Sequence, residues 1–294
     1  MKRGRLGLEA ARVPHRDRHG VVWLSRGQLA VRSGTLHFTT AGDGELEVGD
    51  YDVPYQSVSC FVLGPGASVT HDALRILARH GTGLVVAGTD GVRMYASMPH
   101  GPDSSELARS QVRHWADVHG ARVRVALKMY EWRMGEVLSS TELGVLRGIE
   151  GHRVKETYRL LAQRFGVSWS GRRYDRSRPD QTDPVNAAIN HAAVAARSAA
   201  HIAVAITGTI PQLGFIHEQS GVAFCLDVAD LYRESIVLPA AFTAVKAAGA
   251  RGSDELERAA RRTAGEMIRR QKVIPEMIDR IKELFDADDR DRDA

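Results

Sequence analysis

The segment "MPHGPDSS", residues 98–105, separates two parts of the chain that differ in sequence periodicity. It contains prolines and a glycine, which interrupt regular structure, so it is typical of a linker. Before it, apolar residues come in short runs, and after it they recur at helical spacing. We therefore expect a first domain at 1–100, a second at 101–286 and an acidic tail at 287–294.

The part that precedes this linker has the pattern of a small, mostly antiparallel β domain. Glycine turns punctuate its short apolar runs, and Asp90-Gly91 predicts a two-residue type I′ hairpin turn. One helix interrupts the strands, with Thr70 as its N-cap and Gly81 as its stop signal. The expected strands are "VVWL", "QLAVR", "TLHFT", "ELEV", "SVSCFVL", "GLVVAG" and "VRMYAS".

The part that follows the linker predicts an all-α domain. Residues 105–136 form a long helical segment, and Thr141 is expected to cap the helix after it. Asp183-Pro184 combines an N-cap with a proline at the first helical position, and it opens an alanine-rich helix. Later helices are expected at 230–246, 253–270 and 275–285. The predicted fold class is α+β, with a small N-terminal β domain before an all-α helical domain.

Composition indicates a soluble globular protein. Hydrophobic residues make up 43% of the 294 residues and charged residues 26%. The sequence shows neither an apolar segment of membrane-spanning length nor a signal peptide. Cys60 and Cys225 both lie in apolar runs, which indicates buried reduced thiols in a cytoplasmic protein. The Walker A, dinucleotide-binding and Gly-x-Ser-x-Gly motifs of many small-molecule enzymes are missing.

Positive charge is concentrated in residues 146–178. This stretch holds nine Lys or Arg residues and three acidic ones, within a chain of net charge +4. Such a run is usually a solvated helix face. If the basic face is continuous, its natural partner is a polyanion.

The stretch "GFIHEQSGVAFCLDVADLYR", residues 214–233, has two interpretations. Asp227 and Asp230 are three residues apart, so they would share one face of a helix that begins there. They then cap that helix and favour its positive end, or they belong to a metal site with His217. Glu150 likewise is a plain surface residue or a group presented to a ligand between Gly148 and Gly151. The residues alone favour the simpler interpretation in both cases.

The whole arrangement resembles a known protein family. The motifs "RGIEGHRV", "GRRYD" and "GFIHEQSGVAFCLDVAD" follow one another behind a small β domain. This order is similar to that of the CRISPR-associated integrase of spacer acquisition, also called the CRISPR-associated endonuclease, nearest to its subtype I-E branch. The resemblance runs from about residue 20 to about residue 284.

The resemblance implies a metal-dependent DNA integrase and endonuclease. By analogy, the chain inserts short foreign DNA into a CRISPR array when a DNA 3′-hydroxyl attacks a phosphodiester. The family's metal ligands fall on Glu150, His217 and Asp230, and Asp227 matches a neighbouring acidic position that is a catalytic candidate. One imidazole with carboxylates suits Mg²⁺ or Mn²⁺ better than zinc.

The resemblance also implies partners. These are double-stranded DNA, a second copy of the chain in a homodimer, and a small ferredoxin-like subunit whose dimer two such homodimers flank. The β domain would contribute to dimerisation and DNA contact. Arginines at positions that resemble DNA-backbone contacts are Arg75, Arg93, Arg172, Arg173 and Arg233.

The chain departs from some relatives at two places. Arg26 stands where some carry a tyrosine that stacks on the DNA end, and the acidic tail stands where some carry a proline-rich segment that contacts the partner.

Two other functions are alternatives to the integrase. One is a metal-dependent nuclease on branched DNA, and the other is a non-catalytic DNA-binding scaffold.

Overall fold

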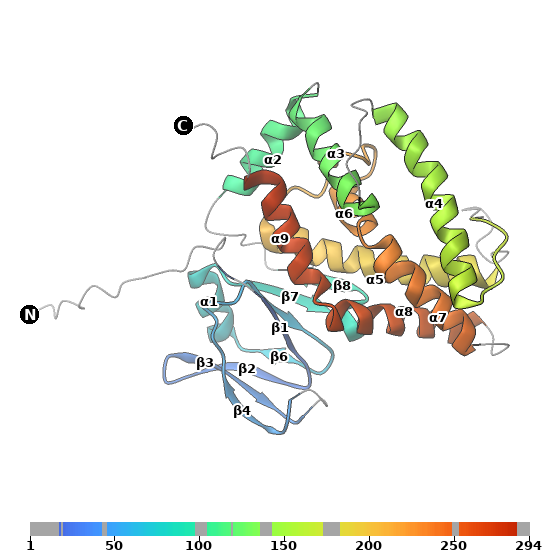
Figure 1. The fold of residues 1–294 in the computed structure, drawn as a ribbon. Coiled ribbons are helices and arrows are strands. Elements are labelled where there is room, and N and C mark those ends of the chain that lie inside the picture. Colours follow the sequence, from blue (N-terminus) through green and yellow to red (C-terminus); the bar gives the residue numbers. More distant parts are fainter. Residues whose placement is uncertain are drawn as a thin grey trace, which may run out of the picture. The chain divides into compact units, whose positions relative to one another are not determined.

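A computed structural model describes residue 18 and residues 20–42, 46–97, 105–118, 120–135, 143–172, 183–248 and 253–286. The chain divides into two compact units, the first formed by Met1–Val86 and Ala96–Ser104, the second by Ala87–Tyr95 and Ser105–Ala294. Strands build the first unit, and the second is mostly helical (Figure 1). The expected fold class, a β domain followed by a helical domain, is confirmed. The expected boundary at residue 100 lies outside the described residues.

The described strands form two four-stranded sheets, ordered β1-β5-β7-β8 and β4-β3-β2-β6. β2 pairs antiparallel with β3, and β3 with β4, but β1 with β5, β5 with β7, and β2 with β6 are parallel. We expected mostly antiparallel strands, and the described pairs are both parallel and antiparallel. Chain crossovers between paired strands, such as the helix between β5 and β7, bring strands together in parallel. The strands are β1 Val21–Leu24, β2 Gly27–Arg32, β3 Thr35–Thr40, β4 Gly49–Asp52, β5 Cys60–Leu63, β6 Ser68–Val69, β7 Gly83–Ala87 and β8 Met94–Ser97.

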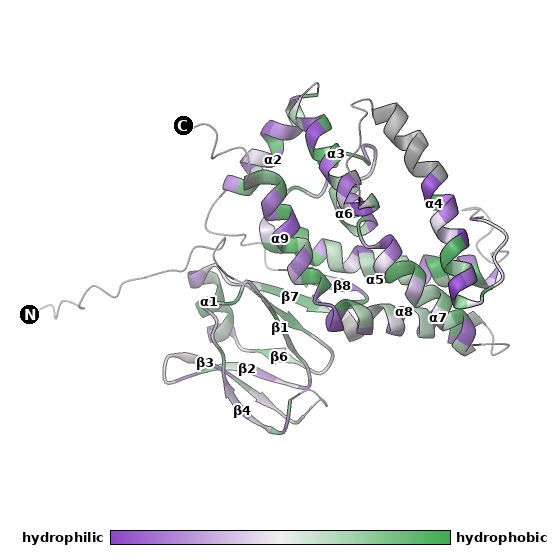
Figure 2. Ribbon diagram, in the orientation of Figure 1, coloured by the Kyte–Doolittle hydropathy of each residue, from purple (hydrophilic) through white to green (hydrophobic). Residues whose placement is uncertain are grey.

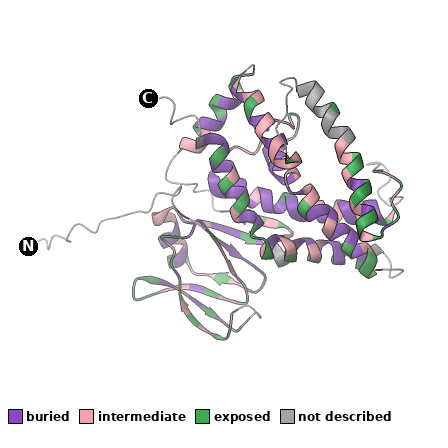
Figure 3. Cartoon of the chain, viewed as in Figure 1, coloured by how far each residue is buried: buried purple, intermediate pink, exposed green. Residues whose placement is uncertain are grey.

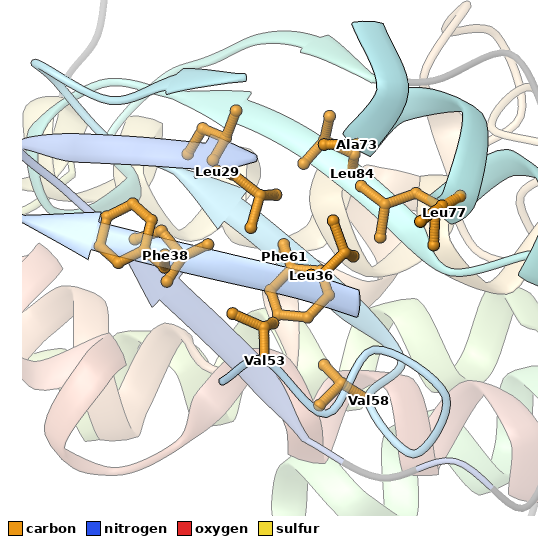
Figure 4. Close-up of a cluster of buried hydrophobic side chains, with 12 residues drawn as sticks. Leu29, Leu36, Phe38, Val53, Val58, Phe61, Ala73, Leu77 and Leu84 are labelled. Atoms are coloured by element: carbon orange, nitrogen blue, oxygen red, sulfur yellow. The ribbon is translucent and has the colours of Figure 1, made fainter. Parts of the chain in front are cut away.

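The helix of the first unit has the ends that the sequence predicts. α1 spans His71–His80, the Thr70 side chain accepts a hydrogen bond from the Ala73 N–H, and Gly81 takes the left-handed conformation. The buried side of α1 packs with residues from both sheets in one apolar core (Figure 4). This core includes Leu29, Leu36, Phe38, Phe61, Ala73, Leu77 and Leu84.

Two local expectations in this region are wrong. Residues 46–48 of "ELEV" are not in a strand, and β4 follows at Gly49–Asp52. β4 is set by its partner, because Tyr51 lies opposite Phe38 and Arg32 and Thr39 both bind Asp50. The expected hairpin turn at Asp90-Gly91 is part of a 3₁₀ turn, Thr89–Gly91.

The second unit surrounds one long helix. α5, Pro184–Thr207, packs against α6, α7, α8 and α9, is mostly hydrophobic (Figure 2), and is buried along much of its length (Figure 3). Its expected start is confirmed, since the Asp183 carboxylate accepts from the N–H groups of Val185 and Asn186. The other helices are α2 Glu106–Ala116, α3 Ala121–Met134, α4 Leu143–Phe165, α6 Ala223–Asp230, α7 Leu238–Ala248, α8 Ser253–Arg270 and α9 Val273–Asp286.

Two helix boundaries differ from expectation. The segment expected as one helix over 105–136 is broken, because the Asp117 carboxylate accepts from the N–H groups of Gly120 and Ala121 and starts α3 anew. The helix expected at 230–246 begins at Leu238, after a π-helical turn over Arg233–Val237. The expected cap Thr141 lies outside the described residues.

The cysteines are buried as expected, and both are free thiols. Burial raises the pKa of the Cys225 thiol to about 12 and that of Cys60 further. Among the described helices, none has the length and apolar character that crossing a membrane requires.

Candidate functional site

The loop before α6 is fixed by one buried carboxylate. Asp227 lies in α6, with its side chain fully buried. Its oxygens accept from the backbone N–H groups of Phe215 at 2.6 Å, Ile216 at 3.1 Å and His217 at 2.8 Å. An isolated buried carboxylate is very costly, so these donors are needed for its stability. Asp227 thereby sets the path of the backbone that carries His217.

Asp227 also orients the His217 imidazole. The Nδ1 of His217 lies 2.7 Å from Asp227 Oδ1. A carboxylate only accepts, so Nδ1 carries a proton, and in the neutral ring Nε2 keeps its lone pair. Nε2 lies 3.9 Å from Asp230 Oδ2. The hydrogen bond to Asp227 raises the pKa of His217.

Asp230 is the last residue of α6, where the helix dipole is negative. A carboxylate there is unfavourable unless cations offset its charge. The Arg233 guanidinium forms an ion pair with Asp230 Oδ1, and Arg133 Nη1 lies 3.9 Å from Oδ2. The Arg133 side chain is 5% exposed, so this partner is largely removed from solvent.

The capping interpretation of the two aspartates is wrong. α6 begins at Ala223, with Val222 as its N-cap residue, so Asp227 and Asp230 lie in its second half. Both carboxylates therefore lie toward the negative end of the helix dipole, where a negative charge is unfavourable. The capping interpretation required them to lie at the positive end. Asp227 contacts His217 and backbone N–H groups, and Asp230 faces His217 and arginines.

The donors of His217 and Asp230 suit a divalent cation. Two ligands at right angles on an ion with bonds of about 2.1 Å lie about 3 Å apart. The observed 3.9 Å between Nε2 and Oδ2 is longer than that separation, so the two side chains would have to move together to share one ion. Within the described part of the chain, no group of three His, Cys, Asp or Glu side chains is placed to hold a metal.

Glu150, the remaining predicted ligand, belongs to α4, and its side chain lies outside the described residues. α4 is nevertheless connected to the site. Tyr158 of α4 is buried, and its hydroxyl lies 3.4 Å from Arg233 Nη1. Its ring contacts Trp169 with a centroid distance of 5.2 Å.

The predicted DNA-binding arginines have different surroundings. Arg233 lies beside Asp230, while the exposed Arg172 donates to the side-chain oxygens of Asn186 and Asn190 in α5. Arg75 lies on α1 and pairs with Asp72 at 3.1 Å. Arg93 is exposed, and Arg173 lies outside the described residues.

Arg133 and Tyr158 contact residues of the site, and the sequence did not predict either of them as a site residue. Arg133 stands three and four residues after the buried Tyr130 and Met129, so it occupies the apolar face of α3. An arginine in that position was the available signal. Tyr158 offered no such signal, because helical spacing does not reveal where a hydroxyl points.

Comparison with known proteins identifies the family. The family model described as "CRISPR associated protein Cas1" matches residues 119–273, which include the described site residues. CRISPR-associated endonuclease Cas1 from Escherichia coli is 33% identical over 276 residues, 94% of this chain and 87% of the relative. A second relative of that name, from Thermus thermophilus, is 34% identical over 81% of this chain and 74% of its own length.

Solved structures agree with this assignment. The TtCas1–DNA complex has a TM-score of 0.79 and 31% identity, and the match covers 92% of this chain and 98% of that one. A casposase bound to its integration product shares the fold, with a TM-score of 0.65 at 14% identity. The family model and the relatives together show that this chain belongs to the CRISPR-associated protein Cas1 family.

Proposed function

We propose that this chain is a metal-dependent DNA integrase that joins short foreign DNA into a CRISPR array. The observation that supports this most is the His217 Nε2 facing Asp230 Oδ2, with Asp227 on the opposite ring nitrogen. A carboxylate that orients a histidine for a metal is a recurrent arrangement in metal sites. The protein chain of the TtCas1–DNA complex is 31% identical to this chain, and this similarity supports DNA as the substrate.

In this proposal, His217 and Asp230 hold Mg²⁺ or Mn²⁺ together with Glu150. The bound ion would acidify the attacking 3′-hydroxyl and stabilise charge on the phosphate. Asp227 keeps Nε2 directed at the site and holds the proton on Nδ1. Arg233 and Arg133 hold the Asp230 carboxylate in place, and they add positive charge beside the expected position of the phosphate.

We further propose that the active assembly contains a homodimer of this chain and a small ferredoxin-like subunit. What supports this part is the resemblance of the motifs in this chain to those of the family. The test combines the purified chain, its partner, a duplex with 3′-hydroxyl ends and a repeat-bearing plasmid. We expect joined product with Mg²⁺ or Mn²⁺ and none in excess chelator. Equal joining in chelator would exclude the metal mechanism.

Two substitutions test the site directly. His217→Ala and Asp230→Ala should abolish joining but leave duplex binding nearly intact, because DNA is held mainly through phosphate contacts elsewhere. Arg159→Ala is a suitable control, since Arg159 is exposed and pairs with Glu156 on its own helix. Full joining by the Asp230→Ala protein would contradict the proposed role of this carboxylate.

The name of the relatives, endonuclease, favours a second candidate. The same residues would then activate water in place of a 3′-hydroxyl. The assay above separates the two reactions, because a nuclease leaves nicked plasmid without a joined strand.

A further inference from the structure

A second group of contacts holds the backbone that leads into the His217 loop. Gln111 of α2 is fully buried. Its Nε2 donates to the carbonyl oxygens of Ile210 and Leu213 at 3.0 Å each, and its Oε1 accepts from the Ile210 N–H at 2.7 Å. A side chain 99 residues away in the sequence thus forms hydrogen bonds with the backbone N–H and carbonyl groups just before the loop.

Trp115 extends this contact by one helical turn. Its indole Nε1 donates to the Gly214 carbonyl at 3.0 Å. Arg122 of α3 lies over the Trp115 ring at 4.9 Å and reaches Glu218, the residue after His217, at 3.5 Å. The loop is therefore held both before and after His217.

The two groups of contacts are complementary in chemistry. The Gln111 amide and the Trp115 indole donate to carbonyl oxygens of residues 210, 213 and 214. The Asp227 carboxylate accepts from the N–H groups of residues 215, 216 and 217. Gly214 lies where the two groups meet, and a Cβ there would be 2.3 Å from the His217 oxygen. The loop is thus fixed in a tight path by opposed donors and acceptors.

We propose that Gln111 and Trp115 are positioning residues for His217, acting through the backbone of residues 210–214. Only the catalytic consequence of this inference rests on the proposed function. A displacement of about 1 Å of a reacting group can cost about a hundredfold in rate. If α2 releases the carbonyls, the backbone before His217 loses these donors, and the Asp227 hydrogen bonds and the Arg122–Glu218 ion pair remain.

The first experiment measures the loop without metal or DNA. Amide hydrogen exchange at residues 215–217 is compared between the parent, Gln111→Met and Trp115→Phe. Gln111→Met keeps the volume but removes every hydrogen bond, so we expect exchange to accelerate about tenfold to a hundredfold. Trp115→Phe removes one donor and should give a smaller increase, in a protein that is expected to fold.

Ser110→Ala is the matched control. Ser110 is the buried neighbour of Gln111 on the same helix, but its hydroxyl donates to the Phe285 carbonyl in α9. This variant should leave exchange at residues 215–217 within about twofold of the parent, once differences in global unfolding are removed with amides inside α5. Unchanged exchange in both loop variants, or an equal acceleration inside α5, would overturn the inference.

The second experiment measures strand joining. Trp115→Phe should lower kcat by about threefold to tenfold and leave the KM for duplex unchanged, because the loop positions a ligand without holding DNA. Faster loop exchange with unchanged kcat would overturn the positioning role. Failure of the parent to join DNA with metal would reject the proposed function, while the exchange result would still stand.

Discussion

At the scale of single residues, Asp227 and Asp230 show that two similar side chains three positions apart do different work. Asp227 is buried and saturated by backbone and imidazole donors, whereas the Asp230 side chain is 20% exposed and faces cations. We infer that Asp227 builds the site and that Asp230 binds within it.

Asp227→Asn is expected to destabilise the protein. The amide would place an NH₂ group against backbone donors that now bind an oxygen, so the free energy of unfolding should fall by about 1–3 kcal/mol. Urea unfolding at neutral pH in chelator measures this decrease. Asp230→Asn is the control and should change stability far less. Equal decreases would contradict the division of roles.

Metal affinity should fall at acidic pH. Asp227 raises the pKa of His217, so the proton is held more tightly than in a free histidine. A cation needs the neutral imidazole, hence a proton competes with it below the raised pKa and is absent well above it. Calorimetric titration with Mn²⁺ between about pH 5.5 and pH 8.5 should show affinity rising with pH and proton release on binding. Identical affinity in the parent and in His217→Ala across this range would exclude His217 as a ligand.

At the scale of helices and strands, the elements that the sequence predicted well have local signals. α1 starts after Thr70 and stops at Gly81, and α5 starts after Asp183; all three caps are visible in the sequence. α6 has no such signal, because the donors to its aspartate come from a loop ten or more residues earlier. β4 is likewise set by its pairing with β3, which overrides the weak strand preference of its glycine and aspartates.

The candidate site divides in the same way. The predicted residues that the structure describes there lie within one short stretch, and local spacing could bring them together: His217, Asp227, Asp230 and Arg233. Gln111, Arg133 and Tyr158 reach the same place from other helices. A single sequence contains no distance information of that kind.

The start of α5 offers a test at this scale. Asp183→Ala removes the acceptor for the N–H groups of Val185 and Asn186 and a 2.6 Å contact with the Asn186 amide. We expect the free energy of unfolding of the helical unit to fall by about 1–2 kcal/mol. Asp183→Ser, which keeps a capping oxygen, should restore most of this stability in chemical denaturation. No recovery would show that the cap is not the stabilising contact.

At the scale of the whole molecule, the proposed binding of DNA can be tested through the basic residues. If Arg172 and Arg93 bind phosphates, each substitution to Ala should weaken binding to unrelated duplexes alike. The slope of log affinity against log salt should fall by about one for each phosphate that is no longer bound. Duplex titrations at low and moderate salt measure both quantities. Arg159→Ala is the control, because Arg159 is exposed and pairs with Glu156 on its own helix, and slopes that match it would show that neither Arg172 nor Arg93 binds phosphate.

The buried thiols have a practical consequence. Alkylation requires the thiolate, and with a pKa of about 12 the Cys225 side chain is almost entirely protonated at pH 8. Maleimide should therefore leave native Cys60 and Cys225 unmodified for hours and label both in urea, which mass spectrometry can count. A cysteine introduced at the exposed Val48 position, 77% accessible, would then carry a spin label or fluorophore alone. The native cysteines therefore need not be removed before a label is attached at position 48.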